Sequence, residues 1–307
     1  RLEYFRAEAG GQSSDFRNRY DERLDKGYEY SVTPSAVIHL NNYNRLYIDY
    51  GYRQRRRTTN RSLYLLNLLD GWGEDTDYGL GQLPSVGEML QALDGVNSPR
   101  ATKMDFVHTP SVKYERETYS DDGTALYFSA TLPLRAERNR LDYRRGALDT
   151  LFHRDVVFLE PQLSFSYGKY PSFALSANYQ YTSSAPEMTY LVDLRDDSNP
   201  LNIMLGNPDL ENRHSHHFDI LFNRALSGQR MYNAGGSFNI HQNSLALGYT
   251  YDRTTGVRTV TPQTVDGNWD ARVHGGFSLP LDSATRWNLQ GNARLAYWNS
   301  VDLIDEQ

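Results

Sequence analysis

The sequence predicts an all-β protein, specifically a portion of an antiparallel transmembrane β-barrel, and the segment 269–297 gives the clearest evidence. Apolar and polar residues alternate along two runs joined by a polar turn at 282–286. Strand side chains point to opposite faces in turn, so each run has one apolar and one polar face. Both runs exceed the five or six residues usual in soluble domains, and roughly 9–11 residues cross a bilayer.

Alternate residues of this segment form two sets, which we call its parities. They predict which side chains face lipid and which face water. The apolar parity includes Phe277, Leu279, Leu289 and Leu295, which we expect to face lipid. The polar parity gives the candidate lumen-facing residues, which are Asp270, Arg272, Asn288, Gln290, Asn292 and Arg294.

Composition excludes a helical membrane protein and leaves the barrel open. Hydrophobic residues make up 39% of the 307 residues, and the mean hydropathy is −0.67. No window approaches the 18 or so apolar residues of a spanning helix, whereas a barrel keeps half of each strand polar. The chain has 23 Tyr and four Trp, which favours aromatic girdles at the membrane boundaries, although Tyr is also common in ordinary strands.

Charge and cysteine content narrow the function classes further. The formal net charge of −6 argues against nucleic acid as a partner. The arginine cluster at 53–61 is interpreted as an exposed loop or a lumen rim. The absence of Cys from the sequence excludes disulfides, thiolate metal sites and cysteine nucleophiles.

Alternation along the whole chain predicts about ten strands. Short turns are expected at 41–45, 120–123, 168–172 and 282–286, and longer or variable connections at 58–103, 183–213 and 252–256. Strands near 231–251 and 257–281 are expected to be continuous. Membrane barrels have short periplasmic turns and longer outer loops. The chain 1–307 is therefore interpreted as one partial barrel domain with outer loops at about 58–103 and 183–213.

One short helix is predicted inside the first long loop. Ser85 and Glu88 have the spacing of a capping box, in which each side chain bonds the backbone N–H of the other residue. Met89, Leu90 and Leu93 supply a short apolar stripe before the chain turns.

Two motifs resemble those of a known family. The first runs through 199–210 and is followed by a strand entrance at 213–219; the second lies at 261–268. Together they resemble the "NPL…LGNPxL…YSHNF" and "NVDG" elements of TonB-dependent receptors of the outer-membrane β-barrel family. His214 and His217 stand where the family usually has Tyr and Asn. The matching residues, interpreted as structural, are Asn199, Pro200, Leu201, Gly206, Asn207, Pro208, Leu210, Val265, Asp266 and Gly267.

The resemblance implies an active importer in the outer membrane of a Gram-negative cell. Such a receptor has about 22 strands around a plug, and it takes up a nutrient too large for porins. No plug is found in this sequence, so the chain is expected to be a piece of a longer protein. The implied partners are outer-membrane lipid and the TonB complex, which acts through the plug. A SusD-like or other surface lipoprotein is a further candidate, and no cofactor is implied.

Catalytic and metal chemistry find no support in the sequence. His214 and His216 share one face and His217 the other, so at most a two-ligand site is expected, and no metal is predicted. No nucleophile elbow or phosphate loop is present in the sequence, so the chain is not expected to be an enzyme. Two alternatives remain: a small passive pore or structural barrel of the outer membrane, and a soluble β-rich surface-binding protein.

Overall fold

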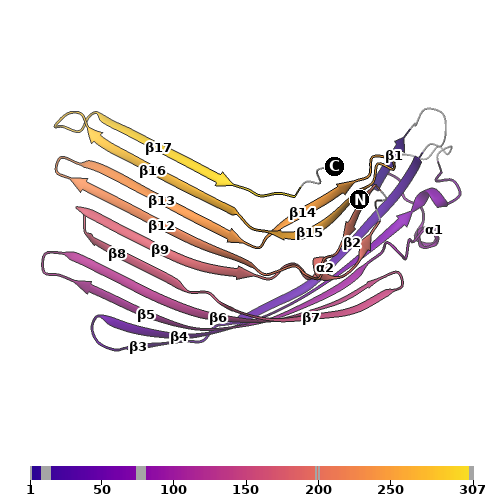
Figure 1. Ribbon diagram of the computed structural model, residues 1–307, viewed down its shortest axis with the longest axis horizontal. Coiled ribbons are helices and arrows are strands. Elements are labelled where there is room, and N and C mark those ends of the chain that lie inside the picture. The colour runs from indigo at the N-terminus through magenta and orange to yellow at the C-terminus, as the bar shows by residue number, and fades with distance from the viewer. Residues whose placement is uncertain (1, 8–14, 74–80, 198, 200, 304–307) are drawn as a thin grey trace.

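The computed structural model describes the chain except residues 1, 8–14, 74–80, 198, 200 and 304–307. Within these residues, thirteen strands form one curved antiparallel sheet that is open at both edges (Figure 1). The order is β1-β2-β4-β5-β6-β8-β9-β12-β13-β16-β17, with β3 and β7 as side members. The strands are β1 (Leu2–Ala7), β2 (Asp15–Val32), β3 (Ser35–His39), β4 (Asn44–Leu65), β5 (Arg100–Tyr119), β6 (Thr124–Arg145), β7 (Leu148–Leu159), β8 (Gln162–Lys169), β9 (Phe173–Ser184), β12 (Arg213–Leu226), β13 (Arg230–Gln242), β16 (Asn268–Pro280) and β17 (Asn288–Asn299). The predicted all-β, antiparallel fold is confirmed.

We call the thirteen-stranded sheet the wall. Proline interrupts the strand at two of its positions. β2 and β3 both pair with β4, and Pro34 lies between them. β7 and β8 both pair with β6, and Pro161 lies between them. Proline has no N–H to donate to a ladder, so it breaks the pairing locally. Each pair therefore continues as one long strand across the wall.

The connections differ in length between the two ends of the wall (Figure 1). One end carries short turns at 40–43, 120–123, 170–172, 227–229 and 281–287. The other end carries the long connections 66–99, 185–212 and 243–267, together with one short turn at 146–147 between β6 and β7. The predicted asymmetry is therefore present, and the turn at 227–229 is an addition to it. We call these the turn end and the loop end. The rule for outer-membrane barrels predicts that the loop end faces outward.

The strands predicted at 231–251 and 257–281 are each two strands, so that prediction was wrong. β14 (Ser244–Tyr251) and β15 (Arg258–Val265) leave the wall and join β11 (Asn202–Leu205) and β10 (Arg195–Asp196) in a separate sheet of four. Residues 252–256 are therefore the tip of the β14–β15 hairpin. The breaks occur at Asn243 and Gly267, which both have positive φ. Alternation continues on each side of such a break, so the pattern alone hides it.

The predicted loop 58–103 begins inside β4 and ends inside β5, because both strands continue past the apolar band. The segment 66–99 contains the 3₁₀ turn η1 (Leu66–Leu68) and the predicted helix α1 (Val86–Gln91). The capping box is present: the Glu88 N–H donates to Ser85 Oγ at 3.4 Å, and the Ser85 N–H donates to Glu88 Oε2 at 2.9 Å. A second helix, α2 (Met188–Leu191), lies in 185–212. None of the described helices has the length and apolar character needed to cross a membrane.

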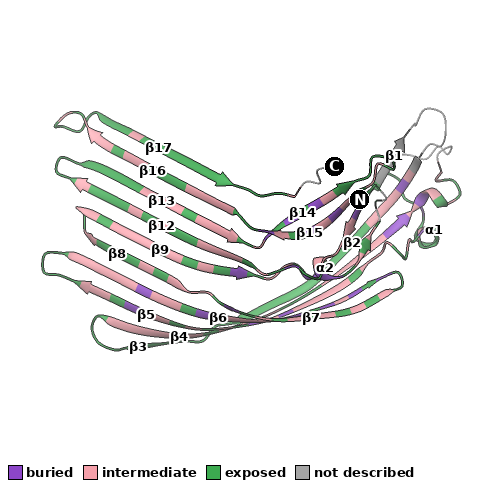
Figure 2. Cartoon of the chain, in the orientation of Figure 1, coloured by how far each residue is buried: buried purple, intermediate pink, exposed green. Residues whose placement is uncertain are grey.

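Burial is concentrated under the loops rather than inside the wall. One cluster joins α2 to β6 through Met188, Val192, Leu141 and Tyr143, and another joins Tyr64, Leu66 and Ala92. Most of the wall is exposed or half-buried, and the buried residues lie mainly toward the loop end (Figure 2). A sheet that leaves large apolar residues exposed on this scale needs a non-aqueous surrounding.

Candidate functional site: the two faces of the wall

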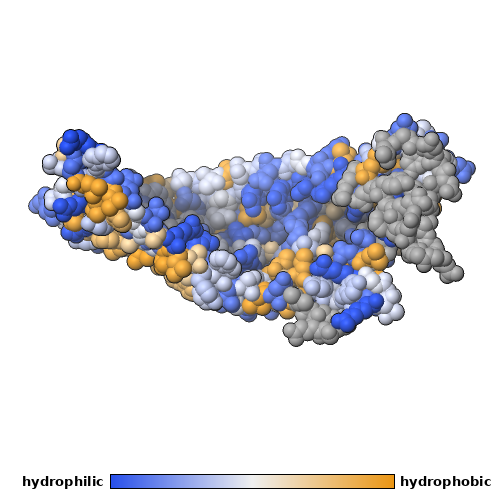
Figure 3. All heavy atoms as spheres, turned by 90° about the horizontal axis from the view of Figure 1, so that it is seen from above, coloured by the Kyte–Doolittle hydropathy of each residue, from blue (hydrophilic) through white to orange (hydrophobic). Residues whose placement is uncertain are grey.

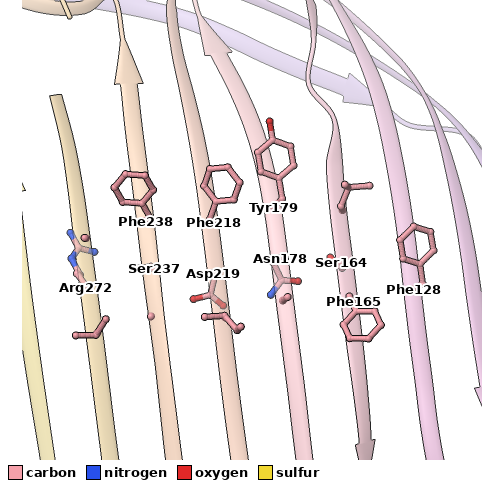
Figure 4. A pocket seen from close by; sticks show the side chains of 16 residues that line it. Phe128, Ser164, Phe165, Asn178, Tyr179, Phe218, Asp219, Ser237, Phe238 and Arg272 are labelled. Atoms are coloured by element: carbon pink, nitrogen blue, oxygen red, sulfur yellow. The ribbon is translucent and has the colours of Figure 1, made fainter. Parts of the chain in front are cut away.

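One register row crosses ten strands and contains only apolar or aromatic residues. At its centre, the rings of Tyr179 and Phe218 lie 4.9 Å apart between centroids, and Phe238 follows on the next strand (Figure 4). The full row is Ile38, Leu46, Tyr114, Ala130, Leu163, Tyr179, Phe218, Phe238, Ala271 and Tyr297. We call the face that carries this row the apolar face.

The adjacent row, on the opposite side of the sheet, is almost entirely polar. Each of its members follows or precedes a member of the apolar row by one residue, so the pleat alone separates them. The row is His39, Arg45, Glu115, Ser129, Ser164, Asn178, Asp219, Ser237, Arg272 and Ala296, with only the last apolar. Figure 3 shows the sheet hollowed, with hydrophilic residues gathered in the hollow. We call this side the polar face.

The apolar face has a limited height along the strands. On β12 its apolar residues lie between His216 and Arg224, a stretch of roughly 26 Å. On β5 the corresponding limits are His108 and Arg116. On strands tilted by about 35–45°, such a stretch covers roughly 20 Å along the membrane normal, which is comparable with the apolar band, about 25 Å tall, of outer-membrane barrels.

Aromatic residues mark the loop-end border of this band. Tyr28 stacks on Tyr30 with ring centroids 6.4 Å apart, and the Tyr50 hydroxyl lies 2.6 Å from Nδ1 of His108. Gln54 connects the group by accepting from Tyr30 at 2.5 Å and donating to the Tyr28 hydroxyl at 3.2 Å. The Tyr and Trp content predicted an aromatic girdle, but it did not identify these residues as its members. The signal was the i, i+2 spacing of Tyr at 28 and 30 and at 50 and 52, which places each pair on one face.

The polar face is held in place by ion pairs and hydrogen bonds. Glu115 is the best example: its carboxylate accepts from Tyr47 at 3.1 Å and from Tyr127 at 3.2 Å, and it pairs with Lys113 at 2.6 Å. Its side chain is only 9% exposed, so these partners offset the cost of removing the charge from water. The network fixes side-chain positions on the inside of the curve.

A cavity of about 360 Å³ lies on the polar face near the loop end, between β4, β5, β6 and the segment that holds α2. Arg55, Arg57 and Arg61 line it from β4, and Lys103 lines it from β5. Lys103 pairs at 3.1 Å with Glu187, next to α2. The basic cluster at 53–61 thus belongs to a strand and not to a loop, and Arg56 faces the opposite side from Arg55 and Arg57 because neighbours on a strand alternate.

The candidate lumen residues share the polar face. Asp270 is the most connected, since its Oδ2 accepts from Asn239 at 3.0 Å and pairs with Arg272 at 3.3 Å. The four candidates on β17 align with the polar parity of β16, and His274, for example, pairs in register with Arg294. All are placed on one side of the sheet, and their contact with an aqueous lumen stays a prediction.

The first family motif fastens the connection 185–212 to the second sheet. A Cβ on Gly206 would overlap the carbonyl oxygen of Val192, so the position requires close backbone approach. Gly206 does not have a positive φ, so the close backbone approach, and not a left-handed turn, explains the need for glycine there. Asn207 Nδ2 donates to the Pro262 carbonyl at 2.9 Å, and Leu210 is buried. Asn199, Leu201 and Pro208 lie in the same connection, and Pro200 lies outside the described residues.

The second family motif returns the chain from the hairpin to the wall. Val265 is buried and pairs with Ser244. Asp266 Oδ1 accepts from the Asn243 N–H at 2.7 Å, which joins the two ends of the hairpin. Gly267 has φ +97°, a conformation that favours glycine. These contacts are made by backbone and turn residues.

The histidines near the loop end bond to tyrosines of the neighbouring strand. His214 Nδ1 lies 2.7 Å from the Tyr181 hydroxyl, and His216 Nδ1 lies 3.1 Å from the Tyr179 hydroxyl. His217 contacts Asn239 on the opposite face. Among the residues that the structure describes, no three His, Cys, Asp or Glu are grouped so that they could hold a metal ion.

Comparison with known proteins adds a family and a fold. The sequence model of the "Outer membrane protein beta-barrel family" matches residues 121–306, more than half of the chain. A search of curated protein sequences gives no match.

Three solved structures are similar to this chain. The ferric citrate transporter FecA aligns over 97% of this chain and 38% of its own, at 15% identity and TM-score 0.53. The Serratia marcescens hemophore receptor HasR, in complex with HasA and heme, aligns over 92% and 43%, at 11% identity and TM-score 0.49. The siderophore receptor PirA from Pseudomonas aeruginosa aligns over 92% and 60%, at 8% identity and TM-score 0.37. The chain spans less than two thirds of each of these proteins. By its sequence match and its two-faced wall, the chain belongs to the outer membrane protein β-barrel family.

Proposed function

We propose that the chain is part of the barrel wall of a TonB-dependent active importer, which takes up a nutrient too large for porins. The observation that carries the proposal is the pair of register rows, one apolar and one polar, that cross ten strands of a sheet with open edges. Lipid cannot hydrogen-bond an open strand edge, so such a sheet needs further strands to close. The outer-membrane family excludes the soluble alternative considered from the sequence.

In this proposal the polar face surrounds a plug and lines the route of the cargo. The candidate lumen residues Asp270, Arg272, Asn288, Gln290, Asn292 and Arg294 would meet water and the plug. The cavity near Arg55, Arg57 and Lys103 lies at the loop end, where cargo would enter. An inner-membrane energy-transducing complex would displace the plug, and a surface lipoprotein of the SusD-like kind would cover the loop end. Co-purification from native membranes tests both partners.

Conductance separates this proposal from a passive pore. The intact full-length protein, reconstituted in a planar bilayer, should show no steady conductance because the plug fills the lumen. Removal of the plug should open a large conductance and sensitise cells to bulky antibiotics that the outer membrane normally excludes. Steady conductance by the intact protein would favour the passive pore instead.

A further inference from the structure

Basic residues without ion-pair partners lie on the apolar face, just beyond the loop-end border of the apolar band. Arg56 on β4 and Arg140 on β6 are both exposed, and among the described residues neither has an ion-pair partner. They belong to one register row, which reads Tyr28, Arg56, Met104, Arg140 and His153 from β2 to β7. Lys26 lies on the same face of β2, two residues closer to the loop end than Tyr28.

The neighbouring register rows indicate how deep this row lies in the membrane. The next two rows toward the turn end contain Tyr30, Tyr52 and His108, members of the aromatic border. Aromatic side chains of this kind take the boundary between hydrocarbon and headgroups. Arg56 and Arg140 therefore lie at the depth of the headgroups in the outer leaflet.

The spacing of the two arginines suits one anionic headgroup. Met104 lies between them in register, so their backbones are two strand spacings apart, roughly 9.6 Å. Two guanidinium groups on flexible side chains can close that distance around one phosphate or span two phosphates of one headgroup. The planar fork of each guanidinium binds phosphate oxygens in pairs.

An apolar groove lies directly below the basic row on the same face. It has a volume of about 590 Å³ and is lined by Phe106, His108, Ala136 and Val157, among others. Ala136 forms its floor, since it pairs with His108 on one side and Val157 on the other. Arg138 and Asp155, paired at 3.1 Å, border the groove on the side nearest the basic row. The groove thus continues from the headgroup depth into the apolar band.

We propose that this surface binds an anionic lipid of the outer leaflet, with its phosphate between Arg56 and Arg140 and an acyl chain in the groove over Ala136. The negative phosphate complements the charge of the basic row, and the acyl chain fills the apolar groove. A free phosphate ion has no group to fill the groove. The bound lipid supplies the counter-charge that the protein does not provide to these two arginines.

The test measures lipid binding by the intact full-length protein in detergent. Diphosphorylated lipid A is titrated and the bound fraction is read by native mass spectrometry. The double variant Arg56→Gln/Arg140→Gln should bind this lipid with an affinity lowered roughly tenfold or more, because it loses charge-assisted contacts to phosphate. The matched control is Arg116→Gln, which removes an exposed arginine of the same face at the turn-end border, and its affinity should stay unchanged.

Two further arms identify the ligand and guard against misfolding. Lipid A without phosphates should bind the wild-type protein as weakly as the double variant binds the phosphorylated form. Heat-modifiable mobility on gels should show that both variants fold, and Arg140→Lys, which keeps the charge, should retain most of the binding. Equal binding by the double variant and the wild type would overturn the proposal. So would an equal loss in Arg116→Gln, or full competition by inorganic phosphate.

Discussion

Replacement of Ile220 by Arg gives the sharpest test of which face meets lipid. Ile220 lies at the centre of the apolar stretch of β12, four residues from His216 and four from Arg224. It is 52% exposed, and its register neighbours on either side are Ala177 and Gly236. Either border is roughly 13 Å away along the strand, beyond the reach of an extended arginine side chain. The new charge would therefore remain in hydrocarbon.

The cost follows from the depth of the site. An arginine at the bilayer midplane on the lipid face of a barrel costs roughly 2–4 kcal/mol. That range corresponds to a loss of between roughly 30-fold and 900-fold in the folding equilibrium constant. The small side chains beside Ile220 offer no carboxylate that could offset the charge.

The assay is reversible, denaturant-dependent folding of the full-length protein into phosphatidylcholine vesicles. The matched control moves the same substitution by one residue, to Leu221→Arg. Leu221 lies on the polar face between Ser176 and Gly235, so the arginine there would meet water and should cost much less. A stability loss for Leu221→Arg equal to or larger than that for Ile220→Arg would refute the assignment of the faces.

Three further predictions concern the loop end. Gly206→Ala should loosen the connection 185–212, because the added methyl group overlaps the Val192 carbonyl oxygen. Limited proteolysis should therefore cut this connection faster in the variant than in the wild type. An unchanged cleavage rate would argue against the need for close backbone approach at Gly206. Ser85→Ala should destabilise α1 by about 1 kcal/mol, seen as faster hydrogen exchange across 86–91, with exchange in the wall strands as the control. Hydrogen bonds from Ser85 lower the pKa of Glu88 below its usual 4.5. The ionised Glu88 side chain therefore stabilises α1 fully above pH 4.5, and this stabilisation is lost as the pH falls through the lower pKa of the folded state. Protection factors of α1 in wild type should fall on acidification and those in Ser85→Ala should change less; equal changes would contradict this.

The wall is the part of the fold that the sequence predicted best. Alternation in 269–297 placed Leu289 and Asn292 on opposite faces, and the same rule holds from β2 to β17. The capping box of Ser85 and Glu88 was also predictable, because all of its contacts span three residues. The break between β13 and β14 was not, because the residues on both sides alternate alike and the change of direction depends on the positive φ of Asn243.

The cavity and the basic row depend on strand register, which the sequence does not contain in readable form. Arg56 and Arg140 are far apart in the chain, and they share a row only because Met104 pairs with both. Gly206 likewise reads as a turn residue until its contact with Val192 is seen.

The sequence by itself determined that one face of each strand is apolar and the other polar, because the period of two is a local property of the extended backbone. The tertiary structure decided which strands become neighbours, where chain segments leave the wall, and which distant side chains share a row. Those features depend on hydrogen bonds between segments that are remote in sequence, and a pattern within one segment carries no record of its partner.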